Sequence, residues 1–128
     1  MAKMKIRPQS CKAKGRNWQK SIAQFLTENL GLEEGDIVSR PMGSPGADLM
    51  MSPTAKRKFP VTIEAKKTAS DPGRKAMKQA QFNASKGTIG AVVWQTNGEG
   101  GIKGEIRFDL KEFISWYIEL SGNTNVKD

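Results

Sequence analysis

The stretch Val61-Thr62-Ile63-Glu64-Ala65-Lys66 carries the clearest pattern in the chain, because apolar and polar side chains alternate along it. Successive side chains of a β-strand point to opposite faces. The stretch therefore predicts a strand whose apolar face packs on a core and whose other face displays Glu64 beside Lys66 on a surface. Residues in this relation lie roughly 6.5–7 Å apart at their Cα atoms.

Turn and cap signals divide the rest of the chain. Gly31 follows an apolar stripe at helical spacing, Asp71 with Pro72 resembles a helix start, and Asp109 with Glu112 resembles a capping box. We expect a helix from residue 16 to 30, strands at 37–40 and 47–51, the strand at 61–66, a helix from 72 to about 85, strands at 89–95 and 102–108, and a final helix after Asp109 whose buried stripe is Leu110, Phe113, Ile114, Tyr117 and Ile118.

These elements predict an α/β fold, a mixed sheet flanked by helices in the order α-β-β-β-α-β-β-α. The chain of 128 residues suits one domain, expected over residues 15–120. A basic flexible arm (residues 1–14) would precede it and a flexible tail (residues 121–128) would follow. No stretch is apolar for the roughly 20 residues of a membrane span, and the N-terminus lacks the apolar region of a signal peptide, so we expect a cytoplasmic protein without a membrane partner.

The composition narrows the chemistry. The chain has one cysteine and no histidine, so zinc sites, histidine general bases and Cys/His nucleophile pairs are all poorly supported. Any bound metal is expected to be a hard cation held by oxygen ligands.

Positive charge is the second strong signal. Lysine and arginine number 21 against 13 acidic residues, a formal net charge of +8, and they cluster at the N-terminus and between residues 56 and 78. Such clusters attract phosphate backbones, whereas a solubilising surface with a basic tail is the plain alternative. The residues expected to contact DNA are Lys14, Arg16, Lys67, Arg74, Lys75 and Lys78.

A carboxylate beside an ammonium on one strand can support metal-dependent hydrolysis. Glu64 and the Ala65 carbonyl would supply oxygen ligands to Mg²⁺, and Lys66 would act on the attacking water or on phosphate charge. Asp48, on the preceding expected strand, is the candidate for the second carboxylate. Glu-x-Lys alone is a weak signal, and an isolated match is usually a surface salt bridge. Asp109-Leu110-Lys111 has the same spacing, yet Asp109 is better explained as a helix cap.

Three segments together resemble the PD-(D/E)XK nuclease superfamily. They are SRPMGSPGADLMMSPTAKRKFPVTIEAKK (residues 39–67), Lys14-Gly15-Arg16 and Lys78-Gln79-Ala80. The resemblance spans roughly residues 14–97. Within the superfamily, this part of the chain is similar to small phage-encoded endonucleases and Holliday-junction resolvases. The resemblance implies a restriction-endonuclease-like fold and Mg²⁺-dependent hydrolysis of DNA, with Mn²⁺ as a substitute. Recognition of branched DNA by shape would suit a small domain without a base-reading element, and cutting both strands would require a homodimer.

The resemblance also implies residue roles. Asp48, Glu64 and Lys66 match the catalytic motif, and Gln79 matches a helix glutamine near the active site of related nucleases. One departure is Gln19, which stands where many resolvase-like relatives carry a metal-binding glutamate. Two other functions stay open: a non-catalytic, basic nucleic-acid-binding module on the same fold, and a structural or assembly protein whose basic tail binds nucleic acid.

Overall fold

The computed structural model describes residues 8–41 and 43–122, with side chains from residue 12 onward. Within them the fold is mixed α/β, with four helices, a two-stranded sheet and a three-stranded sheet. The elements are α1 (Pro8–Asn29), β1 (Ile37–Ser39), β2 (Leu49–Met51), α2 (Pro53–Lys58), β3 (Val61–Thr68), α3 (Gly73–Asn83), β4 (Ile89–Thr96), β5 (Glu105–Arg107) and α4 (Leu110–Leu120).

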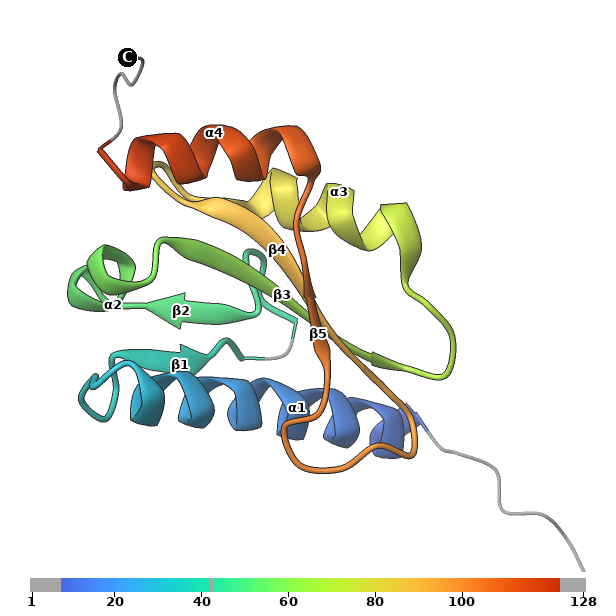
Figure 1. Cartoon of the computed structure of the whole chain (residues 1–128). Coiled ribbons are helices and arrows are strands. Elements are labelled where there is room, and N and C mark those ends of the chain that lie inside the picture. Colours follow the sequence, from blue (N-terminus) through green and yellow to red (C-terminus); the bar gives the residue numbers. More distant parts are fainter. Residues whose placement is uncertain (1–7, 42, 123–128) are drawn as a thin grey trace, which may run out of the picture.

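The larger sheet has the order β3-β4-β5. Strands β3 and β4 are parallel and joined through α3, and β5 returns antiparallel to β4. Strands β1 and β2 form an antiparallel hairpin in which Ser39 pairs with Leu49. Helix α1 lies on one side of the larger sheet and α3 on the other; α4 is seen near α3, and its Phe113 and Trp116 pack against the core that α1 also contacts (Figure 1).

The main core lies between α1 and the sheet. Trp18 and Ile22 of α1 pack there with Val61 and Ile63, the apolar residues of the alternating stretch. Burying such side chains contributes roughly 1.5–3 kcal/mol each, which fixes the face that β3 turns toward α1. The opposite face of β3, which carries Glu64, therefore faces α3.

Helix α3 packs closely on the sheet because β4 carries a glycine beneath it. A Cβ at Gly90 would lie 2.4 Å from the Ala80 carbonyl oxygen, so a side chain at residue 90 would push the helix outward. Ala76 and Ala80 form the buried face of α3, against Val92. The close approach brings the polar residues of α3 over β3.

The structure corrects several expected boundaries. Helix α1 begins at Pro8, so residues 8–14 are helical and do not belong to a flexible arm. Residues 1–7 and 123–128 of the expected arm and tail lie outside the described residues. Helix α3 begins at Gly73, because the Asp71 carboxylate accepts a hydrogen bond from the Gly73 backbone N–H (2.7 Å) across Pro72. Strand β5 is shorter than expected, and residues 102–104 belong to the preceding loop.

Helix α2 was not expected, so the order of elements is α-β-β-α-β-α-β-β-α. Its signal is present in the sequence: Ser52 is the N-cap, and its hydroxyl accepts from the Ala55 backbone N–H while Pro53 occupies the first turn. Asp109 does cap α4 as predicted, accepting from the Glu112 backbone N–H at 3.0 Å.

The predicted buried stripe of α4 was wrong except at Phe113. Leu110 is 74% exposed, and Ile114, Tyr117 and Ile118 are also exposed. Only Phe113 and Trp116 pack against the core, with the Trp116 indole N–H donating to the Pro60 carbonyl at 3.0 Å. Helical periodicity identifies an apolar face but cannot say whether the same chain covers it. No helix within residues 8–41 and 43–122 has both the length and the apolar character of a membrane span.

Candidate active site

Asp48 joins the hairpin to the larger sheet. Its Oδ2 accepts a hydrogen bond from the Ala65 backbone N–H at 2.7 Å, so the carboxylate lies beside the residue that follows Glu64. Burial raises the pKa of Asp48, while the Ala65 N–H and the nearby Lys66 and Arg40 charges oppose that rise. The geometry thus brings together two motif residues that are separated in the sequence.

Glu64 is buried, not displayed on a surface as the strand pattern predicted. It is 2% exposed, because α3 covers this face of β3. Its Oε1 has no hydrogen-bond partner within the described part of the chain, and Oε2 lies 3.6 Å from Lys66 Nζ. Burial, and secondarily the neighbouring Asp48, raises the pKa of Glu64 to about 7. A buried carboxylate oxygen without a partner is costly and is typical of a site that receives a cation or donor.

Lys66 and Gln79, which the resemblance placed in the same site, lie in contact. The Lys66 ammonium donates to Gln79 Oε1 at 3.3 Å, which holds Lys66 between the helix and Glu64. Asn83 lies one helical turn beyond Gln79, and its amide favours the charged form of Glu64, lowering the pKa of that carboxyl. Asn83 was missed by the sequence analysis, although its i,i+4 spacing from Gln79 was a usable signal.

Arg40 is a second residue that was missed. Its backbone N–H donates to the Asp48 carbonyl at 2.8 Å, so the two residues face each other across the hairpin, and the Arg40 charge lowers the pKa of Asp48. The Arg40 Nε–H donates to the Ala47 carbonyl, and the guanidinium covers Gly46. A Cβ at Gly46 would lie 2.8 Å from Arg40 Cζ, and its φ of +112° also favours glycine.

Gln19 is buried, at 8% exposed, under the hairpin. Its Oε1 accepts a hydrogen bond from the Ser39 hydroxyl at 2.6 Å, so the amide joins α1 to β1. The described residues contain no group of three or more Asp, Glu, His or Cys side chains that could hold a metal ion. The candidate ligands are therefore Asp48, Glu64 and the Ala65 carbonyl, without a further acid from α1.

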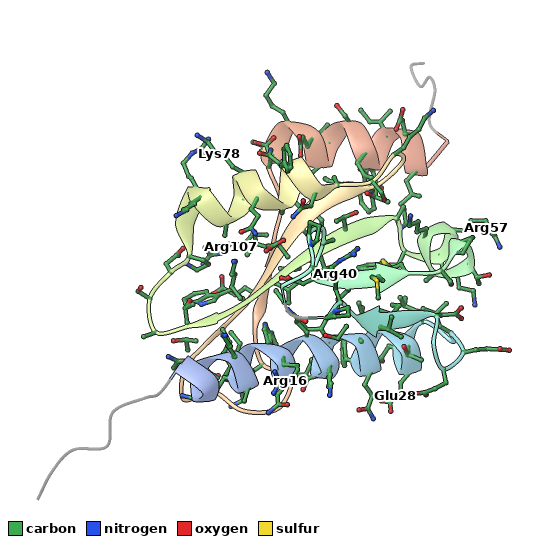
Figure 2. All side chains as sticks on the ribbon, turned by 180° about the vertical axis from the view of Figure 1, so that it is seen from behind. Arg16, Glu28, Arg40, Arg57, Lys78 and Arg107 are labelled. Atoms are coloured by element: carbon green, nitrogen blue, oxygen red, sulfur yellow. The ribbon has the colours of Figure 1, made fainter. Side chains whose placement is uncertain are left out.

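The expected DNA-contacting residues divide into separate groups. Arg74, Lys75 and Lys78 lie on α3, and Figure 2 shows Lys78 on that helix, Arg16 on α1 and Arg40 between the two helices. Lys14 is half-buried on α1. Lys67 does not join them: its ammonium donates to Gln95 Oε1 and to the Glu99 carbonyl, so it holds the loop after β4.

Comparison with known proteins gives no match to a family model, to a curated protein or to a solved structure.

Proposed function

We propose that this chain is a metal-dependent endonuclease that hydrolyses DNA phosphodiester bonds. The observation that carries the proposal is the buried Glu64 Oε1, which lacks a partner within the described residues next to the Asp48 carboxylate. Asp48 is half-buried and accepts a hydrogen bond from the Ala65 backbone N–H, whereas the fully buried Glu64 Oε1 is left for a cation. The expected restriction-endonuclease-like topology belongs to the same proposal and is supported by a Glu-x-Lys strand that contacts both β2 of the hairpin and α3.

The residues present fit a hard divalent cation. Asp48, Glu64 and the Ala65 carbonyl would hold Mg²⁺ or Mn²⁺, and Mg²⁺ usually keeps several waters as its remaining ligands. When bound, such an ion supplies a water of lowered pKa and offsets phosphate charge. Lys66 places its ammonium beside Glu64 and would neutralise charge on the phosphate, and Gln79 fixes the direction of Lys66.

Binding of DNA would rest on Arg74, Lys75 and Lys78, the exposed cations of α3, together with Arg16 on α1. These side chains suit phosphate contacts, which position a nucleic acid without reading its sequence. Recognition of branched DNA by shape agrees with this arrangement.

The Lys66→Ala variant is expected to lose metal-dependent cleavage by about 100-fold or more, because it removes the cation nearest to Glu64. The assay incubates the chain with plasmid and with four-way-junction DNA in Mg²⁺, in Mn²⁺ and in EDTA. The matched control is Lys111→Ala, an exposed lysine on α4. Equal cleavage by wild type and Lys66→Ala, or cleavage that persists in EDTA, would contradict the proposal.

A non-catalytic nucleic-acid-binding module is the second candidate, favoured by the two-carboxylate site and by the neutral Gln19. With two carboxylates and no third acid, most ligands of a bound Mg²⁺ would be waters and substrate phosphates. Wild-type chain that binds these DNAs and cuts none of them in any metal supports the module and ends the enzyme proposal.

The homodimer expected for cutting both strands needs an interface, for which α4 is the candidate. Leu110, Ile114, Tyr117 and Ile118 are exposed there, and the helix carries both acidic and basic residues, so two copies of a chain with net charge +8 would meet with little repulsion. We expect wild type to be dimeric in light scattering and Ile114→Glu to be monomeric. Ser115→Glu, with the same charge on the next residue, is the control. A monomeric wild type at high concentration would contradict this assignment.

A further inference from the structure

A cavity of about 340 Å³ opens next to the candidate active site. Ala47 and Leu49, which flank Asp48, line one side, and Thr62 and Asn83 line another. Thr62 lies on the same face of β3 as Glu64, two residues before it, and the Asn83 amide acts on Glu64 itself. The cavity thus lies on the side of Glu64 away from Lys66 and the basic start of α3.

Two cations border this cavity. The Arg40 guanidinium is held by the Ala47 carbonyl through one of its five N–H donors, and the other donors are in a fixed fork suited to phosphate. Lys56 of α2 is exposed and takes part in no ion pair with the described residues. An anionic group at the rim would meet both cations.

Among the hydroxyl groups that line the cavity, one can rotate to donate a hydrogen bond to a ligand. Thr88 donates to the Ser85 carbonyl (2.7 Å), so in its 2.7 Å contact with Thr62 the Thr62 hydroxyl is the donor. Thr62 Oγ1 also accepts from the Ser85 backbone N–H, which completes its bonds. The Ser85 hydroxyl has only a long 3.3 Å contact to Thr88 and can rotate toward a ligand at little cost.

The remaining wall of the cavity is apolar and includes flexible methionine side chains. Met50 of β2 lines the cavity together with Leu49 and Met51. Methionine adapts to flat aromatic groups and makes favourable sulfur–ring contacts. These groups match the three parts of one nucleotide. The cations at the rim suit its phosphate, the methionine suits the plane of its base, and the amide and hydroxyl groups suit the edge of its base.

We propose that this cavity holds one unpaired nucleotide of the DNA strand, next to the bond that is cut. Its volume lies in the lower part of the roughly 300–1,000 Å³ range of small-ligand sites, which admits a single base and not a stacked base pair. A nucleotide must leave the duplex to enter, and this is least costly where the strand is already unpaired. The inference rests on the proposed nuclease function for its position in the reaction and predicts preference for forked over fully paired DNA.

The first test measures binding without cleavage. A 5′-phosphorylated thymidine trinucleotide is titrated into the metal-free chain in EDTA, and the amide signals of Thr62, Ser85 and Thr88 are followed by NMR. We expect them to shift in wild type and affinity to fall roughly fivefold in Lys56→Ala, the size expected for one charge-assisted contact, but not in Lys111→Ala. Ser85→Leu, which fills the cavity, is expected to abolish the shifts. No shift in wild type, or equal losses in both lysine variants, overturns the proposal.

The second test separates this inference from the nuclease proposal. Wild type and Ser85→Leu are compared in Mg²⁺ on a forked duplex and on a fully paired duplex of the same sequence. We expect wild type to prefer the fork at least fivefold and Ser85→Leu to lose the preference. Equal cutting of both DNAs by wild type overturns the cavity assignment and leaves the nuclease intact. No cutting of either DNA ends the nuclease proposal, and the trinucleotide titration then decides the cavity.

Discussion

Glu64→Gln is expected to stabilise the metal-free chain at pH 8 by about 3 kcal/mol while abolishing DNA cleavage. The pKa of Glu64 is about 7 in the folded chain against an ordinary value of 4.5, and this interval corresponds to about 3 kcal/mol. The cause is burial of the carboxylate at 2% exposure, with Asp48 as its neighbour. Glutamine has nearly the same shape and carries no charge at any pH.

The dependence on pH follows from the sign of that change. Below pH 4.5 Glu64 is protonated in both states, and its burial is least costly. Between pH 4.5 and 7 the folded chain holds a proton that the unfolded chain has lost, so the free energy of unfolding falls as pH rises, and the loss is complete above pH 7. The advantage of Glu64→Gln therefore grows from pH 4.5 to pH 8.

Urea unfolding in EDTA at several pH values measures this difference. Glu119→Gln, which replaces an exposed carboxylate on α4, is the control and should show no such growth. Adding Mg²⁺ at pH 8 should stabilise wild type, since a ligand that binds only the folded state raises its stability, and should leave Glu64→Gln unchanged. A constant difference between wild type and Glu64→Gln across this pH range would show that Glu64 is not buried as a charged ligand.

Much of the sheet could be predicted because its signals are local. Alternation identified β3, and β-branched residues identified β4. The prediction that Asp48 lies beside β3 came from the family resemblance. The hydrogen bond from the Ala65 N–H to the Asp48 carboxylate is the contact that holds it there. Gln79 also came from the resemblance, and the structure places it in contact with Lys66, 13 residues earlier.

The remaining features depend on contacts between distant elements. Alternation places Glu64 opposite Ile63, but only the close packing of α3 over Gly90 buries it. The same limit applies to Arg40, whose position follows from the hairpin register. The exposure of α4 was mispredicted in the opposite sense. Its apolar stripe was predicted to be buried, but the described residues leave it exposed.

Asp48→Asn and Asp48→Ala are expected to separate the two roles of Asp48. The carboxylate accepts from the half-buried Ala65 backbone N–H and is also a proposed metal ligand. An asparagine oxygen can still accept that hydrogen bond, and burial raises the pKa of Asp48, so at pH 8 Asp48→Asn should be at least as stable as wild type. Alanine leaves the N–H without a partner, and Asp48→Ala should lose about 1–3 kcal/mol. Thermal unfolding at pH 8 in EDTA compares the three chains.

Cleavage is expected to fall in both variants to the same extent. Removing one of the two carboxylates weakens stabilisation of the transition state by several kcal/mol, or on the order of 10³-fold in rate. The unequal stability and equal inactivity together assign the hydrogen bond to the fold and the negative charge to the metal. If Asp48→Asn cuts DNA at the wild-type rate, Asp48 acts only as a link between β2 and β3. The metal would then depend on Glu64 alone, too few ligands for the proposed site.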